Sequence, residues 1–200
     1  GWLRGTPVSS RRLSITTRMT LKGTTFLVVS AMLLIALLEW RGFLAGMPLR
    51  TKWLNAFFSG VTPRTAGFNS IDYADAHPIT LMVTDIYMFI GGGSAGTAGG
   101  IKVTTAMVLL AAMAAEFRGR SATTVGHRTV PKSVVRQAMT VAAAGIGAVT
   151  AGVATLRICD PQFTADQVNF EVISAFATTG LSTGITADLS TPSQLALCLL

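Results

Sequence analysis

Two short segments carry the residue types and spacing that could replace the hydration shell of a cation. The first reads Val-Thr-Pro-Arg-Thr-Ala-Gly-Phe-Asn at residues 61–69, and the second reads Thr-Thr-Gly-Leu-Ser-Thr-Gly at residues 178–184. Each follows a short apolar stretch with a serine, Ser59 or Ser174, although aligning the serines needs a gap of two residues. Rings of backbone carbonyls in glycine-bearing loops replace the water around potassium in channels. The two segments therefore predict an ion-selective pore.

The residues predicted to line this pore lie at the two Thr-x-Gly sequences. They are Thr65, Ala66, Gly67 and Phe68 in the first loop, and Thr178, Thr179, Gly180 and Leu181 in the second. Glycine allows the backbone angles that turn successive carbonyls toward one axis. If the preceding short helices point their C-terminal ends at the pore, their negative dipole ends also favour a cation. We expect Arg64 to pair with an acid or with carbonyls and to brace the first loop.

The composition indicates a membrane protein. Half of the 200 residues are hydrophobic and 12% are charged, whereas an ordinary soluble domain has about 25% charged residues. The net charge of +7 could suggest nucleic acid, but the basic residues lie in blocks beside apolar runs, as expected of cytoplasmic loops. Aromatic interleaving and a soluble basic domain are missing. We expect a multi-pass protein of the cell membrane, with the lipid bilayer and no nucleic acid as its surroundings.

The chain reads as an all-α polytopic membrane protein built from two similar units of about a hundred residues. The predicted parts are a cytoplasmic basic segment at 1–22, a first unit at 23–115, a cytoplasmic basic loop at 116–137 and a truncated second unit at 138–200. The expected helices cover 24–40, 51–60, 79–90, 103–115, 138–156, 168–177 and the beginning of a span at 195–200. Because two units are too few to enclose a pore, we expect the chain to be an internal piece of a longer protein.

A glycine-rich stretch at 91–100 interrupts the last membrane helix of the first unit, since six glycines in ten residues weaken any helix. A phosphate-binding loop would need Gly-Lys-Ser/Thr, but Ile101 separates Gly100 from Lys102. Close helix packing through Gly96 and Gly100 is a second interpretation. We favour a mobile gate beneath the pore, because glycine adopts unusual backbone angles at least cost. The predicted gating residues are Gly91, Gly92, Gly93, Ser94, Gly96, Gly99, Gly100 and Lys102.

No constellation of residues predicts catalysis, a metal site other than for potassium, or a cofactor. His77 and His127 have no partner at suggestive spacing. Asp85 lies inside an apolar stretch, so it is either a functional residue or a structural partner. A secondary transporter of an organic solute remains the alternative function, because it also uses broken helices. That alternative predicts one substrate cavity rather than repeated loops, and a membrane enzyme would need a titratable cluster.

Three segments together resemble the membrane subunits of the Trk/Ktr/HKT potassium transporters: 61–69, Gly-Gly-Ile-Lys-Val-Thr-Thr at 99–105, and 174–184. The resemblance implies four membrane–pore–membrane repeats around one pore, of which this chain would hold the third and most of the fourth. It also implies that Gly67 and Gly180 are selectivity glycines and that 91–105 is an intramembrane gating loop. The absence of a proline in the middle of that loop makes the chain look Ktr-like.

The same resemblance implies partners and an activity. Members of the family form dimers and bind a cytosolic ring of nucleotide-binding regulatory subunits, which the basic cytoplasmic loops would contact. The expected activity is potassium uptake, either passive or coupled to sodium, with no enzymatic step and no cofactor.

Overall fold

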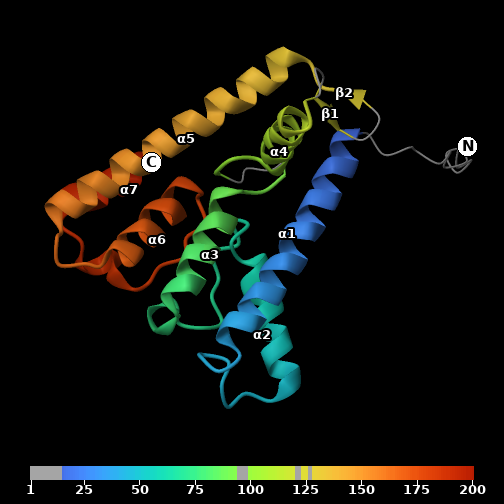
Figure 1. Cartoon of the computed structure of the whole chain (residues 1–200). Coiled ribbons are helices and arrows are strands. Elements are labelled where there is room, and N and C mark those ends of the chain that lie inside the picture. The colour runs from blue at the N-terminus through green and yellow to red at the C-terminus, as the bar shows by residue number, and fades with distance from the viewer. Residues whose placement is uncertain (1–14, 94–98, 120–122, 126–127) are drawn as a thin grey trace, which may run out of the picture.

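The chain folds into two similar helical units, which the computed structural model describes over residues 15–93, 99–119, 123–125 and 128–200 (Figure 1). The first unit contains α1 (Ile15–Glu39), α2 (Leu49–Val61), a 3-10 turn (Tyr73–Asp75), α3 (Pro78–Phe89) and α4 (Val103–Phe117). The second contains α5 (Lys132–Cys159), α6 (Ala165–Phe176), a 3-10 turn (Ile185–Asp188) and α7 (Thr191–Leu199). This order confirms the predicted repetition of a long helix, a short helix, a loop and a second helix.

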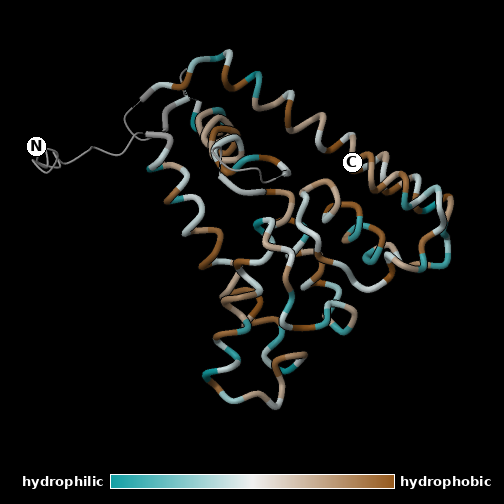
Figure 2. Tube along the Cα trace, turned by 180° about the vertical axis from the view of Figure 1, so that it is seen from behind, coloured by the Kyte–Doolittle hydropathy of each residue, from teal (hydrophilic) through white to brown (hydrophobic). Residues whose placement is uncertain are grey.

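Two helices in the described part of the chain are long and apolar enough to cross a membrane, within Thr17–Glu39 and Lys132–Cys159. A span needs about 20 residues, and both helices exceed that length. Large apolar side chains such as Phe26, Leu37 and Ile146 are exposed along them, as a lipid-facing surface requires. Figure 2 shows hydrophobic residues along the length of both long helices.

Both long helices begin earlier than expected from the sequence, and α5 begins at Lys132 rather than at residue 138. The first helix begins at Ile15 rather than near residue 24, so Arg18 and Lys22 lie in its first turns. Arginine and lysine are good helix formers because their unbranched side chains lose little rotamer freedom in a helix. The helix can therefore include both residues. The predicted basic loop contains a short antiparallel hairpin of β1 (Thr124–Val125) and β2 (Arg128–Thr129), which the sequence did not indicate.

Each short helix lies beside the long helix of its own unit, α2 against α1 and α6 against α5 (Figure 1). Gly60 permits the first contact, because a Cβ there would lie 2.9 Å from the Met32 backbone nitrogen. The two units meet where α3 packs against α6. The Tyr73 and Phe170 rings lie 5.2 Å apart in a buried cluster at this junction. Burial of these side chains fixes the two loops that follow α2 and α6 relative to each other.

Candidate ion-selective site

The first loop begins where α2 ends and closes back on itself. The Ala66 N–H donates to the Thr62 carbonyl at 3.2 Å, which continues the helical direction for one more turn. The Thr62 hydroxyl then donates to the Phe68 carbonyl at 2.5 Å and ties the end of the loop to its beginning. Thr62 is buried, so this bond is shielded from water. The threonine that precedes the proline in the sequence motif thus holds the loop closed.

The second loop leaves α6 in a similar way but through a different set of backbone bonds. The N–H groups of Ala177, Thr178 and Thr179 donate to the carbonyls of Ile173, Ala175 and Ser174, each at 2.9 Å. These bonds consume the carbonyls in the last turn of α6, which would otherwise lack partners. The backbone therefore leaves the helix at the beginning of the second segment, over residues 178–181.

The two loops share one unusual backbone pattern. Thr65 and Gly67 have φ values of 65° and 71°, and Thr178 and Gly180 have values of 52° and 83°. In each loop the residue between them is not left-handed, so the hand of the backbone alternates at the threonine, the middle residue and the glycine. A left-handed threonine is costly, and its occurrence at equivalent positions of both loops marks an imposed geometry.

The two loops also touch each other at their glycines. A Cβ at Gly67 would lie 2.5 Å from the Thr179 carbonyl oxygen, and a Cβ at Gly180 would lie 3.7 Å from the Gly67 Cα. Gly67 is thus needed both for its backbone angle and for the close approach of its neighbour. Gly180 has room for a Cβ, but its positive φ is an angle that residues with a Cβ rarely adopt. The structure therefore brings together the two sets of residues predicted to line the pore.

A polar hollow of about 440 Å³ lies at one end of these loops. Its lining residues are Asn69, Ser70, Ile71, Asp72, Gly180, Ser182 and Gly184, drawn from both loops. Carboxylate, amide and hydroxyl oxygens are the ligands that hard cations prefer. The hollow therefore presents a suitable mouth for a hydrated cation at the end of the paired loops.

A buried carboxylate braces the second loop next to this hollow. Oε1 of Glu171 accepts hydrogen bonds from the Ser182 hydroxyl at 2.6 Å and from the Thr183 N–H at 2.9 Å. Oε2 accepts from the Thr186 hydroxyl at 2.7 Å. Glu171 lies on α6 and is 4% exposed. The sequence showed only an acid within an apolar run, and nothing in its local pattern pointed to residues 11 to 15 positions later.

The glycine-rich interruption separates α3 from α4, as predicted, and its two ends are held together. The Ile101 N–H donates to the Phe89 carbonyl at 3.0 Å, and the Val103 N–H donates to the Gly92 carbonyl at 3.2 Å. A Cβ at Gly91 would overlap the Gly99 carbonyl oxygen. The two ends of the interruption therefore lie too close together for a larger residue at position 91. Ser94 and Gly96 lie outside the described residues.

This interruption contacts the second loop directly. The Gly99 N–H donates to the Thr178 hydroxyl at 2.9 Å. A Cβ at Gly99 would lie 2.8 Å from the Ala177 carbonyl carbon and oxygen. Thr178 is one of the two left-handed threonines, so the predicted gating segment is bonded to a residue of the predicted filter. Lys102 stands at the N-cap of α4.

Two further sequence candidates have buried polar atoms without a hydrogen-bond partner among the described residues. All three guanidinium nitrogens of Arg64 are buried and donate to no acceptor among the described residues, so the predicted brace is not observed there. Asp85 is buried on α3, and its Oδ1 accepts no hydrogen bond from the described part of the chain. Unpaired polar atoms at membrane depth are costly. The described structure therefore shows no compensating partner for the Arg64 guanidinium or for Oδ1 of Asp85.

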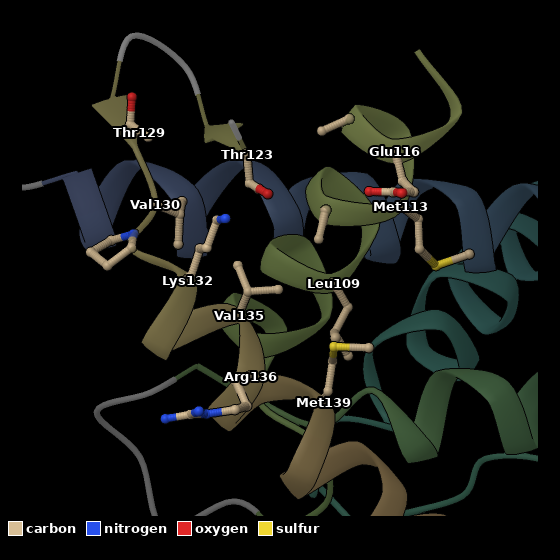
Figure 3. Close-up of a pocket in the computed structure, with 13 residues that line it drawn as sticks. Leu109, Met113, Glu116, Thr123, Thr129, Val130, Lys132, Val135, Arg136 and Met139 are labelled. Atoms are coloured by element: carbon tan, nitrogen blue, oxygen red, sulfur yellow. The ribbon is translucent and has the colours of Figure 1, made fainter. Parts of the chain in front are cut away.

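A separate pocket of about 660 Å³ lies at the far end of the molecule, between α4, the hairpin and α5 (Figure 3). Apolar side chains such as Leu109, Val135 and Met139 form much of its lining. Glu116, Lys132 and Arg136 are the charged residues that border it. The pocket borders the segment predicted as the second basic cytoplasmic loop, and its lining among the described residues includes none of the paired loops.

Long apolar helices that flank two short helices, each ending in a left-handed glycine loop, define a membrane protein of the pore-loop class. The chain belongs to the TrkH family of cation transport proteins, whose family profile matches residues 12–200. It is accordingly an integral protein of the cell membrane. The predicted membership of the Trk/Ktr group and the predicted all-α membrane fold are both confirmed.

Individual relatives agree with this assignment. The chain is 37% identical over 186 residues to the Ktr system potassium uptake protein B of Bacillus subtilis, which covers 92% of this chain and 42% of that protein. It is 33% identical over 191 residues to the potassium/sodium uptake protein NtpJ of Enterococcus hirae, covering 94% and 42%. The crystal structure of the potassium transporter TrkH from Vibrio parahaemolyticus matches the fold with a TM-score of 0.72 at 20% identity, covering 90% of this chain and 40% of that one. The chain therefore spans about two fifths of the length of these relatives.

Proposed function

We propose that the protein containing this chain takes up potassium across the cell membrane through a pore with a carbonyl-lined filter. The filter would include the backbone of residues 65–68 and 178–181. The observation that carries the proposal is the matched pair of left-handed residues in two loops that touch at Gly67 and Gly180. Both relatives named above are potassium uptake proteins by their names, which supports the choice of ion.

The arrangement of charges and dipoles favours a cation over an anion. The C-terminal ends of α2 and α6 lead directly into the loops, and helix C-termini carry a partial negative charge. Asp72 borders the polar mouth, and a lining carboxylate raises the local concentration of cations. No cofactor enters this mechanism, and no chemical bond is made or broken. Sodium is the ion expected to compete or to be coupled.

The residues around Gly91 and Gly99 would act as the gate. The bond between the Gly99 N–H and the Thr178 hydroxyl gives this segment a direct contact with the filter. A shift of the glycine segment would then change both the path beneath the filter and the anchoring of Thr178. Glycine permits such a shift at low conformational cost.

The assembled protein is proposed to be a homodimer with a cytosolic nucleotide-binding regulatory ring. The basic segment around Lys132 and Arg136, with the adjacent pocket of Figure 3, is the surface that such a ring would reach. Its charge suits an acidic partner surface. This part of the proposal depends on the orientation that places the segment in the cytoplasm.

The experiment is potassium uptake by the full-length parent protein in cells that lack their own potassium uptake systems. Growth at low potassium should be restored by the parent protein with its regulatory partner, and Gly180→Ser should reduce the preference for potassium over sodium. Gly46→Ser is the matched control, because Gly46 has a similar φ of 80° but nothing within 4 Å. Failure of the well-expressed parent protein to restore growth would favour the transport of an organic solute instead.

A further inference from the structure

Each of the two long helices ends at a buried acid. Glu39 is the last residue of α1 and is 1% exposed, and Asp160 directly follows α5 and is 4% exposed. Acidic side chains at the end of a membrane span usually remain in contact with water. A buried carboxylate needs hydrogen-bond donors to offset the loss of hydration. Besides the nearby donors Phe43 and Gln162, both acids use donors that lie 30 or more residues later in the sequence.

Glu39 binds the beginning of α3. Its Oε1 accepts hydrogen bonds from the His77 N–H at 2.9 Å and from the Thr80 hydroxyl at 2.5 Å. His77 is the N-cap residue of α3, and Thr80 lies at the third helical position. Oε2 of Glu39 also accepts a bond of 3.3 Å from the Phe43 N–H. The acid therefore joins the C-terminal end of α1 to the N-terminus of α3.

Asp160 binds the beginning of α7 in the same manner. Its two oxygens accept bonds of 3.2 and 3.1 Å from the Ser190 N–H, and Oδ2 accepts a bond of 2.8 Å from the Ser190 hydroxyl. Ser190 is the N-cap residue of α7, and Ser193, which also bonds to Asp160, lies at the third helical position. The same two helical positions thus contact an acid in both units, although the residues at those positions differ. We call this arrangement the carboxylate clasp.

The clasp has a constant register relative to the filter. His77 lies ten residues after Gly67, and Ser190 lies ten residues after Gly180. A 3-10 turn occupies the intervening segment in both units, at Tyr73–Asp75 and at Ile185–Asp188. The acids, by contrast, precede their filter glycines by different distances, 28 residues for Glu39 and 20 for Asp160. What the two units share is therefore the length of chain between the filter and the clasp.

We propose that Glu39 and Asp160 are positioning residues for ion selection, a role that rests on the proposed function. Glu39 holds the N-terminus of α3 against the end of α1, and Asp160 holds the N-terminus of α7 against the end of α5. The ten-residue segment that follows each filter glycine ends at this N-terminus. The clasp therefore fixes the far end of that segment in each unit. Coordination of an ion by backbone carbonyls depends on their spacing and orientation. Loss of a clasp should therefore change which ion is preferred, in addition to lowering stability.

The test uses variants on both sides of the clasp in the full-length protein with its regulatory partner. Glu39→Met and Asp160→Leu remove the charge and both accepting oxygens at similar volume, and Thr80→Val and Ser193→Ala remove one donor each. Selectivity is measured as the half-saturating concentration of sodium divided by that of potassium for uptake. We expect about a tenfold fall for each acid variant and a smaller fall for each donor variant. The Glu39→Met, Thr80→Val double variant should be no worse than Glu39→Met, because both changes remove the bond between the Thr80 hydroxyl and the acid.

Asp75→Asn and Asp188→Asn are the matched controls. Both acids are exposed and lie eight residues after their filter glycine, at the end of the 3-10 turn. Their removal takes the same charge from the same face without breaking a clasp, so selectivity should stay at the parent value. An equal loss in these controls would show that outer charge, and not the clasp, sets the preference, and would overturn the inference.

The outcomes separate the inference from the function on which it rests. A parent protein that does not transport potassium refutes the proposed function. A parent protein that does transport potassium, with unchanged selectivity in all four clasp variants, refutes only the role of the clasp. If the acid variants do not reach the membrane, Thr80→Val and Ser193→Ala decide the question, because each leaves the carboxylate and the backbone bonds in place.

Discussion

Substitution of three left-handed glycines by alanine should separate backbone strain from crowding in the filter. Gly46, Gly67 and Gly180 have φ values of 80°, 71° and 83°. A Cβ at such an angle costs about 1–2 kcal/mol per residue, and this cost is common to all three. Gly46 lies in open space, whereas the other two lie where the loops touch. Gly46→Ala therefore measures the strain alone, outside the filter.

Crowding adds a second cost at only one of these positions. A Cβ at Gly67 would lie 2.5 Å from the Thr179 oxygen, against 3.7 Å to the nearest atom for a Cβ at Gly180. Overpacking of this kind costs about a further 1–3 kcal/mol. Gly67→Ala should therefore destabilise the loop pair by about 2–5 kcal/mol, and Gly180→Ala by about 1–2 kcal/mol. Each 1.4 kcal/mol that falls on the ion-binding conformation alters ion preference about tenfold.

Two measurements on the full-length protein test this order. Thermal unfolding should show similar losses for Gly46→Ala and Gly180→Ala and a larger loss for Gly67→Ala. Competition between potassium and sodium for uptake should be unchanged in Gly46→Ala, reduced about tenfold in Gly180→Ala and reduced further in Gly67→Ala. The reasoning is refuted if Gly67→Ala is no worse than Gly180→Ala. It is also refuted if Gly46→Ala loses as much selectivity as the two filter variants.

Three further predictions concern the surroundings of the filter. Thr178→Val removes the acceptor for the Gly99 N–H and should raise the rate of uptake severalfold by loosening the gate, whereas Thr178→Ser should behave as the parent; equal rates would contradict this link. Glu171→Ala leaves several donors unpaired and should lower stability by about 3 kcal/mol in thermal unfolding, with a smaller loss for Glu171→Gln. Hydrogen bonds from the Ser193 hydroxyl, and then from Ser190, hold the pKa of Asp160 below its usual value of 3.8. Its stabilisation should thus be complete above that value and disappear as the pH falls through the lowered pKa, and thermal unfolding of Asp160→Asn should lack this acid dependence.

Local sequence patterns were sufficient to predict the elements whose cause is local. Six glycines within ten residues cannot continue a helix, and the interruption between α3 and α4 lies where they occur. Proline at the first turn marked the beginning of α3 at Pro78. The two Thr-x-Gly sequences were recognised by their composition, and the structure places them side by side. The left-handed angles at Thr65 and Thr178, however, are imposed by the surrounding packing and are invisible in the residue type.

Interactions between distant residues could not be predicted in the same way. Glu39 contacts residues 38 and 41 positions later in the chain, and no periodic pattern connects them. In the sequence it was only an acid at the end of an apolar run, a common feature of membrane interfaces. The expected partner of Arg64 is not observed among the described residues. The hairpin at β1 and β2 is too short for a strand pattern to stand out.

The comparison of the two units shows which constraint the fold preserves. The acid is glutamate in one unit and aspartate in the other, and the N-cap is His77 in one and Ser190 in the other. The spacing of ten residues from filter glycine to N-cap is nevertheless the same. A hydrogen-bonded anchor can be built from several residue types. A segment of fixed length, however, places its filter glycine at a fixed distance from that anchor. A pore that surrounds one ion with loops from several units needs those loops at the same level along its axis. The length of the segment between the glycine and the N-cap residue is therefore the property that the repeat has to keep.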